Sequence, residues 1–222
     1  MKQQAPPHHL TVVFMGDSIT EGQYVHHSLR WAEIVSTRLK ARFSDRLKPE
    51  RQFYYVHGVS GETTRQGLER FPRDVQQFRP NLMTLQFGLN DCNCWDTDLG
   101  LPRVSEAAYR ANLQEMIDRA KRFDARHIIL STNHPTLRVR KLASGKSLEE
   151  HRLIYNDIVR DVAHGTGVTL CDIEKVFARF DREGLEELLL PEPDVLHLSP
   201  TGHRIYADAI YEPLESAIDS LL

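Results

Sequence analysis

The sequence has few cysteines, no repeated segment and no surplus of basic charge. Its 222 residues include only Cys92, Cys94 and Cys171, and such a small, odd number is not typical of a disulfide framework. Cys92 and Cys94 are spaced like half of a metal site, but the second pair that a tetrahedral zinc site would use is missing. The formal net charge is −3, which argues against nucleic acid as a partner, because nucleic-acid binders usually carry a basic face. We therefore expect no metal, no disulfide framework and no nucleic acid.

Long apolar runs are also missing from the sequence. No stretch approaches the roughly 20 apolar residues of a membrane span. No apolar segment of signal-peptide length precedes Thr11. We therefore expect a cytoplasmic protein without a membrane span, although the mature form of a secreted protein would look the same. Residues 1–9 are polar with two prolines, and we expect a flexible N-terminal segment there. No pattern in the sequence indicates an oligomeric state.

Short apolar runs alternate with longer amphipathic stretches along the chain. The runs cover residues 10–15, 53–59, 82–87, 127–132 and 168–172. Most are continuously apolar, as in strands that are buried on both faces of a parallel sheet. Apolar residues at helical spacing lie between them. The last helix is expected to begin with Ser199 as N-cap and Pro200 at its first position, and to bury a stripe of Ile205, Ala209, Leu214 and Ile218. The pattern predicts one α/β domain over residues 1–222, a three-layer α/β/α sandwich around a parallel sheet.

Four polar segments follow these apolar runs. They are Gly16-Asp17-Ser18, residues 58–64 with Gly61 among them, Gly88-Leu89-Asn90-Asp91, and Asp194-Val195-Leu196-His197 just ahead of the last helix. Each segment alone has an ordinary structural interpretation, such as a helix cap, a strand-to-helix turn, an Asx turn or a surface ion pair. Ligands of open parallel sheets bind at the carboxyl ends of the strands. Since all four segments lie at that end, we expect them to form one site.

The residue types in these segments are those that acyl transfer requires. Ser18 is the expected nucleophile. His197 is the expected base, and Asp194 can bind one imidazole nitrogen so that the other is free to accept the proton of a serine hydroxyl. Backbone N–H groups near Gly61 and the side-chain amide of Asn90 are expected to donate hydrogen bonds to an oxyanion. This chemistry requires neither a metal nor an organic cofactor.

These four ordered motifs resemble those of the SGNH hydrolase superfamily, also called GDSL-type esterases and lipases. The superfamily letters correspond to Ser18, Gly61, Asn90 and His197, and Ile19 stands where the family usually has leucine. The resemblance implies a flavodoxin-like sandwich with five parallel strands and a Ser–His–Asp triad of Ser18, His197 and Asp194. It also implies an oxyanion hole made by the N–H groups of Ser18 and Gly61 and by the amide of Asn90.

We therefore expect a serine esterase that acts on a small-molecule ester, with a short acyl chain or an acetylated carbohydrate. Lysophospholipase, thioesterase and acyltransferase activities would use the same site and stay open. Two alternatives from other classes are a metal-dependent phosphoesterase and a non-catalytic module that binds carbohydrate or acyl groups. Inactivation by a chelator would favour the former, and loss of a triad member would favour the latter.

Further residues are candidates for the edge of the substrate pocket. Asp17 and Asp91 flank the motifs, and we expect their carboxylates to bind loop backbone. Trp95 and His134 follow the third and fourth apolar runs, and each is a candidate pocket wall. The segments 92–104 and 133–147 are expected to be lids or walls. The second of them is basic, which favours an anionic or sugar-rich substrate; its cations are Arg138, Arg140, Lys141 and Lys146.

Overall fold

The sheet of this protein has five parallel strands in the order β2-β1-β3-β4-β5. The computed structural model describes residues 8–222, so most of the expected flexible segment 1–9 lies outside the described residues. The strands are β1 (Leu10–Gly16), β2 (Gln52–Gly58), β3 (Leu82–Gln86), β4 (His127–Ser131) and β5 (Thr169–Cys171). All seven residues of β1, which lies between β2 and β3, are buried. The predicted flavodoxin-like parallel sheet is confirmed.

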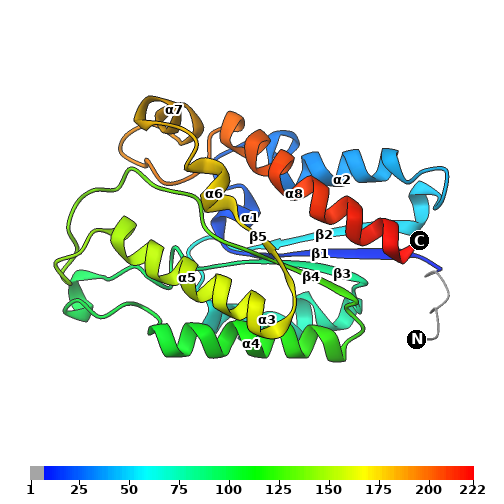
Figure 1. The fold of residues 1–222 in the computed structure, drawn as a ribbon, viewed down its shortest axis with the longest axis horizontal. Coiled ribbons are helices and arrows are strands. Elements are labelled where there is room, and N and C mark those ends of the chain that lie inside the picture. Colours follow the sequence, from blue (N-terminus) through cyan, green and yellow to red (C-terminus); the bar gives the residue numbers. More distant parts are fainter. Residues whose placement is uncertain (1–7) are drawn as a thin grey trace.

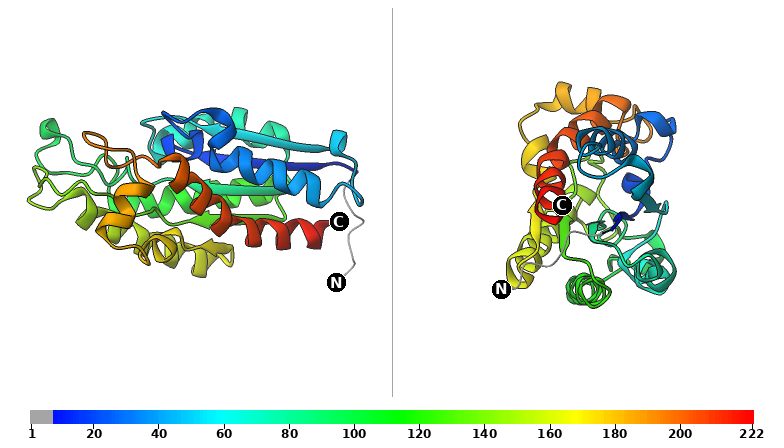
Figure 2. Two further views of the ribbon diagram at one scale, coloured as in Figure 1. Left: turned by 90° about the horizontal axis from the view of Figure 1, so that it is seen from above. Right: turned by 90° about the vertical axis from the view of Figure 1, so that its right-hand side faces the viewer.

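Helices cover both faces of the sheet (Figures 1 and 2). One face carries α2 (Trp31–Arg42) and α8 (Pro200–Leu221), which run side by side, and the other carries α3 (Thr64–Asp74), α4 (Glu106–Arg122) and α5 (Leu148–Thr166). The shorter helices are α1 (Ser18–Glu21), α6 (Ile173–Phe177) and α7 (Arg182–Leu188). Single 3₁₀ turns are η1 (His27–Leu29), η2 (Pro49–Arg51), η3 (Gln76–Phe78) and η4 (Asp96–Asp98).

The last helix begins as expected but turns a different face to the core. The hydroxyl of Ser199 accepts a hydrogen bond from the N–H of Gly202, and Pro200 is the first helical residue. The expected buried stripe began with Ile205 and Ala209, which are only half-buried. The observed stripe runs through Tyr206 and Ile210 to Leu214 and Ile218. Tyr206 decides the rotation, because its ring stacks on the buried indole of Trp31 with 4.8 Å between ring centroids.

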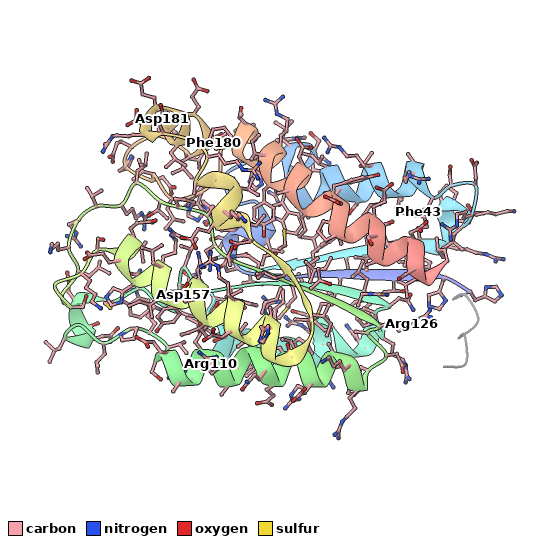
Figure 3. The ribbon with its side chains drawn as sticks, in the orientation of Figure 1. Phe43, Arg110, Arg126, Asp157, Phe180 and Asp181 are labelled. Atoms are coloured by element: carbon pink, nitrogen blue, oxygen red, sulfur yellow. The ribbon has the colours of Figure 1, made fainter. Side chains whose placement is uncertain are left out.

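The carboxyl ends of the strands lie at one end of the molecule, and their amino ends lie at the other. The long loops after β3 and β4 project from the carboxyl end, at the left of Figure 1, and the C-terminus lies at the other end. In Figure 3, Arg126, just before β4, is at the amino end, and Asp181, before α7, is at the outer surface of the carboxyl half. All four polar segments from the sequence therefore lie at the end with the long loops.

Two glycines allow α1 to pack directly on the ends of β1 and β2. A Cβ atom on Gly16 would lie 2.1 Å from Oγ1 of Thr20 and 2.5 Å from the carbonyl oxygen of Gln86. A Cβ atom on Gly58 would lie 2.1 Å from the backbone nitrogen of Glu21. Since real Cβ atoms do not approach so closely, only glycine fits at both positions. This close packing holds the first turn of α1, which includes Ser18, at the carboxyl ends of β1 and β2.

Candidate active site

Ser18 is the first residue of the short helix α1, separated from the end of strand β1 by Asp17 alone. Asp17 caps this helix, because its Oδ1 accepts a hydrogen bond of 3.0 Å from the N–H of Ile19. Gly22 closes the helix with a left-handed backbone, φ 72°. Ser18 is only 5% exposed. The hydroxyl is therefore held between a strand end and a helix N-terminus, with little freedom.

The side chains of Ser18, His197 and Asp194 form a hydrogen-bonded chain. Nε2 of His197 lies 3.0 Å from Oγ of Ser18, and Nδ1 lies 2.8 Å from Oδ2 of Asp194. A carboxylate can only accept, so Nδ1 carries the hydrogen and Nε2 is left to accept the serine proton. Ser18 and His197 are 179 positions apart in the sequence, and the fold brings them together.

Asp194 uses both of its carboxylate oxygens. Oδ1 accepts hydrogen bonds from the N–H groups of Leu196 and His197, at 3.0 and 2.7 Å, and Oδ2 binds the imidazole. Partial burial alone would raise the pKa of Asp194, but the hydrogen bonds from the backbone and imidazole of His197 hold that pKa below its usual value. Asp194 is therefore ionised at neutral pH and can stabilise an imidazolium.

Donors suited to an oxyanion lie at the start of α1 and on the loops after β2 and β3. Within residues 8–222, the N–H groups of Ser18 and Gly61 have no hydrogen-bond acceptor. Gly61 has φ 77°, and a Cβ atom there would meet nothing within 4 Å, so the space in front of it is open. One N–H of the Asn90 amide donates to the carbonyl of Glu62 at 3.0 Å. An amide has two such hydrogens, so the second is available to a ligand.

The loop that carries Gly61 is tied to its neighbours on both sides. The carboxylate of Glu21, on α1, accepts from the N–H of Ser60 at 2.8 Å and also from its hydroxyl. Nη1 of Arg103 donates to the carbonyl of Gly61 at 3.0 Å. These contacts fix the loop relative to Ser18 and place the three expected donor groups on adjoining segments.

Asp17 and Asp91 are fully buried beneath the site, so their expected place at the pocket edge is wrong. Their carboxylates bind backbone, as expected: Asp17 accepts from the N–H of Ile19, and Asp91 accepts a hydrogen bond of 2.9 Å from the N–H of Thr64, the first residue of α3. Burial raises the pKa of Asp17 to about 7 and that of Asp91 to about 6. Both residues hold the starts of helices, which is a structural task that needs a buried acceptor.

His134 does not line a pocket either. Its ring is fully buried against Phe177, with 5.6 Å between ring centroids, and its Nε2 lies 2.8 Å from the carbonyl oxygen of Leu196. Burial lowers the pKa of His134 to about 4, so the ring is neutral at neutral pH. The carbonyl can only accept, so Nε2 carries the hydrogen. His134 thus faces the turn that carries Asp194 and His197 from within the protein.

Trp95 does reach the surface, between two hollows. A cavity of about 550 Å³ takes its walls from both expected loops and from the segment before His197. Trp95, Leu137, Arg138 and Val195 are among its lining residues, whereas Ser18 is not. A second hollow of about 390 Å³ is also lined by Trp95, together with Arg103. Trp95 is 51% exposed, and the guanidinium of Arg103 lies over its ring, 4.4 Å from the centroid.

The sequence interpretation missed three contacts of the site. Tyr24 packs edge-on against the His197 imidazole, 5.3 Å between centroids, from a left-handed backbone with φ 67°. Arg103 holds Gly61, as described above. Arg138 was expected to face the substrate; it lines the cavity, but its Nε donates to the carbonyl of Asp194 at 2.9 Å. Tyr24 and Arg103 do not follow a strand directly, so no local pattern marked them. The basic segment marked Arg138, but its charge pointed to a ligand and not to the backbone of Asp194.

Residues 8–222 include no cluster of metal-ligating side chains and no helix suited to crossing a membrane. Within this range, no three His, Cys, Asp or Glu side chains are grouped so that they could hold a metal ion. Cys92, Cys94 and Cys171 are buried free thiols. None of the helices in the described part of the chain is both long enough and apolar enough to cross a membrane.

Comparison with known proteins gives matches over most of the chain. The GDSL-like Lipase/Acylhydrolase family matches residues 14–205. The uncharacterized lipoprotein YqeF of Bacillus subtilis is 28% identical over 225 residues, 90% of this chain and 88% of that protein. Esterase TesA of Pseudomonas aeruginosa is 28% identical over 136 residues, 61% of this chain and 59% of that protein.

Solved structures share the same fold. LAE5, an alpha/beta hydrolase enzyme from the metagenome of Lake Arreo, aligns with a TM-score of 0.75 at 25% identity, covering 96% of both chains. The acetyl xylan esterase AlAXEase aligns with a TM-score of 0.73 at 20% identity, covering 92% of this chain and all of the other.

Proposed function

This chain belongs to the GDSL-like lipase/acylhydrolase family, and from that membership we propose that it is a serine esterase whose triad is Ser18, His197 and Asp194. The observation that carries the proposal is the hydrogen-bonded chain of these three side chains, at 3.0 and 2.8 Å. A nucleophile, a base in the correct tautomer and an orienting carboxylate are the minimum for acyl transfer through a serine.

In the first half of the reaction, Oγ of Ser18 attacks the ester carbonyl while Nε2 of His197 takes the serine proton. The imidazolium then gives this proton to the leaving alcohol, and Asp194 stabilises the positive ring throughout. The N–H groups of Ser18 and Gly61 and the second amide hydrogen of Asn90 donate to the oxyanion. One such donor is worth about 100- to 1,000-fold in rate. Water, activated by His197, then cleaves the acyl-enzyme and releases the carboxylic acid.

We propose a short-chain ester of a carbohydrate as the substrate. Acetyl xylan esterases are among the proteins with this fold, and the wall residue Trp95 offers a half-exposed indole ring beside two hollows. A sugar ring presents C–H groups that pack on such a surface, while its hydroxyl groups can bind the arginines nearby. The cavity lined by Trp95, Arg138 and Val195 has a volume of about 550 Å³, which lies within the range of small-molecule sites.

The cellular location stays a prediction. We propose a cytoplasmic enzyme on the sequence pattern alone, while the Bacillus subtilis relative carries the name of a lipoprotein. Fractionation of cells that produce the native chain would decide between the two.

The test is a profile of ester hydrolysis with p-nitrophenyl acetate, butyrate, octanoate and palmitate, alongside acetate release from acetylated xylo-oligosaccharides. We expect the acetate esters to react fastest, a serine-directed phosphonate to inactivate the enzyme, and a chelator to have no effect. Ser18→Ala should abolish hydrolysis while the folded state persists. Wild-type turnover by this variant, or inactivation by the chelator alone, would refute the proposed mechanism. A maximum at long acyl chains would contradict the proposed substrate but not the triad.

A further inference from the structure

The loop after β4 donates hydrogen bonds to three successive carbonyl groups of the turn at residues 194–197. Nε of Arg138 donates to the carbonyl of Asp194 at 2.9 Å. The N–H of Leu137 donates to that of Val195 at 3.0 Å, and Nε2 of His134 donates to that of Leu196 at 2.8 Å. We call residues 134–138 the supporting segment. Its three donors come from one side chain, one backbone amide and a second side chain, all on the same short stretch.

Other polar groups of this turn are paired as well. The carbonyl of His197 accepts from the N–H of Leu190 at 2.7 Å. The N–H groups of Leu196 and His197 both donate to Oδ1 of Asp194. These two N–H groups are thus bound within the turn, by the Asp194 carboxylate. Three of the turn's four carbonyl groups accept hydrogen bonds from the supporting segment.

Such support is needed because the turn contains a strained residue. Val195 has φ 46°, in the left-handed region, which a β-branched side chain rarely adopts. A conformation of this kind is unfavourable and persists only where surrounding contacts over-determine it. Val195 lies between Asp194 and His197, so relaxation of its backbone would change the relative position of the carboxylate and the imidazole.

The two side-chain donors are suited to this task in different ways. His134 is fully buried, and its neutral ring with hydrogen on Nε2 is a rigid donor. Arg138 is half-buried and always charged; besides its bond to the backbone, its Nη2 lies 4.0 Å from Oδ2 of Asp194. His134 contacts only the backbone of the turn, whereas Arg138 contacts both the backbone of the turn and the carboxylate of Asp194.

We propose that His134 and Arg138 are positioning residues, which hold Asp194 and His197 in the geometry that the reaction needs without touching the substrate's reacting atoms. This inference rests on the proposed function, because it assigns a role to residues that support the proposed triad. Loss of either donor should lower kcat, since a displacement of about 1 Å at a reacting group can cost about 100-fold in rate.

The kinetic test uses pairs of variants that differ in whether a donor is kept. His134→Phe removes the donor and preserves bulk, whereas His134→Gln retains an N–H that can reach the carbonyl. Arg138→Met and Arg138→Lys form the second pair, and Lys141→Met is the control for loss of a cation from the same loop. We expect His134→Phe to lower kcat about tenfold or more at unchanged KM, and His134→Gln to restore part of it. Arg138 also lines the cavity, so its replacement can change KM as well. Its two variants are therefore compared in kcat alone.

A second readout follows the turn itself and does not depend on turnover. The Nδ1–H proton of a histidine bound to a carboxylate gives a separate low-field NMR signal, which we expect in the wild type and in Lys141→Met. Exchange broadening or loss of this signal in Arg138→Met and His134→Phe supports the proposal. In an Asp194→Ala background, Arg138→Met should cause no further loss of kcat, because Arg138 acts through Asp194.

The outcomes separate this inference from the proposed function. If the wild type hydrolyses no ester, the proposed function fails, and the NMR signal alone decides on positioning. If His134→Phe does not fold, the comparison of Arg138→Met with Arg138→Lys decides whether the supporting segment positions the turn. Wild-type kcat and an unchanged Nδ1–H signal in Arg138→Met would overturn the inference for Arg138, and the same result in His134→Phe would overturn it for His134. Equal losses in the Gln and Phe variants would also overturn it, since they would indicate a packing effect.

Discussion

Replacement of Asp194 by asparagine removes one charge and leaves the shape of the side chain intact. The two oxygens of this carboxylate have different partners: Oδ1 accepts from two backbone N–H groups, and Oδ2 accepts from Nδ1 of His197. An asparagine has only one oxygen for these two places. If the NH₂ group of the asparagine took the place of Oδ1, it would face the N–H groups of Leu196 and His197. Three donors would then meet without an acceptor. The amide oxygen of the introduced asparagine should therefore bind the backbone, and its NH₂ group should face the imidazole.

This orientation forces His197 into the wrong tautomer. Nδ1 must then accept a hydrogen bond, so the ring hydrogen moves to Nε2, which lies 3.0 Å from Oγ of Ser18. A nitrogen that already carries hydrogen cannot take the serine proton. A wrong tautomer in a triad costs about 10⁴ in kcat, which corresponds to about 5.4 kcal/mol of transition-state stabilisation at about 1.36 kcal/mol per factor of ten.

The assay compares kcat for p-nitrophenyl acetate in the wild type and in Asp194→Asn at pH 7. The unfolding midpoint in urea should change little, because the asparagine oxygen keeps both backbone hydrogen bonds. Asp181→Asn is the matched control: Asp181 caps α7 at the outer surface (Figure 3), and asparagine is an equally good cap. A kcat within tenfold of the wild type in Asp194→Asn would refute the assignment of Asp194 as the orienting acid.

Three further predictions test the oxyanion donor, the buried acid and the tight glycine contact. Asn90→Ala should lower kcat about 100- to 1,000-fold with little change in KM; an effect on KM alone would make Asn90 a substrate-positioning residue. The folded chain binds the Asp17 proton more tightly than the unfolded chain, so the free energy of unfolding should fall as the pH rises from about 4 to about 7. Asp17→Asn should make this slope shallower in urea titrations at several pH values, and an unchanged slope would contradict the high pKa. Gly16→Ala should lower the free energy of unfolding by about 1–3 kcal/mol, because its Cβ would lie 2.1 Å from Oγ1 of Thr20. Gly165→Ala, where the added Cβ meets nothing, should raise it by about 0.4–1 kcal/mol, and equal effects of the two glycine variants would contradict the steric argument.

The strands and the locations of the motifs could be predicted from the sequence. Continuous apolar runs identify strands that are buried on both faces, and all five predicted strands occur within about two residues of their expected ends. Edge strand β5 is the shortest, Thr169–Cys171, and all three of its residues pair with β4. In a parallel sheet, a residue that follows a strand must lie at the carboxyl end, so the placement of Ser18 and Asn90 at one end also followed. The turn at 194–197 is separated from β5 by α6 and α7, so this rule alone does not place it.

The depth of side chains at that end could not be read in the same way. Asp17, Asp91 and His134 all follow strands, and a polar residue in such a position can either face a ligand or bind backbone beneath it. In the structure all three bind backbone. The two aspartates accept hydrogen bonds from N–H groups at the starts of helices, and His134 donates to a carbonyl of the turn at 194–197. A local pattern shows that a residue is polar, but its partner is decided by segments far away in the chain.

What the sequence by itself determined is thus the set of reacting groups and the end of the sheet at which they meet, since strand periodicity and motif order are local properties. Only the tertiary structure decided which groups support them. The contact of residues 134–138 with the turn at 194–197 joins segments about 60 residues apart, and neither segment carries a pattern that specifies the other. Such pairings depend on strand order and on how the loops pack above the sheet, because a hydrogen bond between loops requires a geometry that only the assembled layers provide.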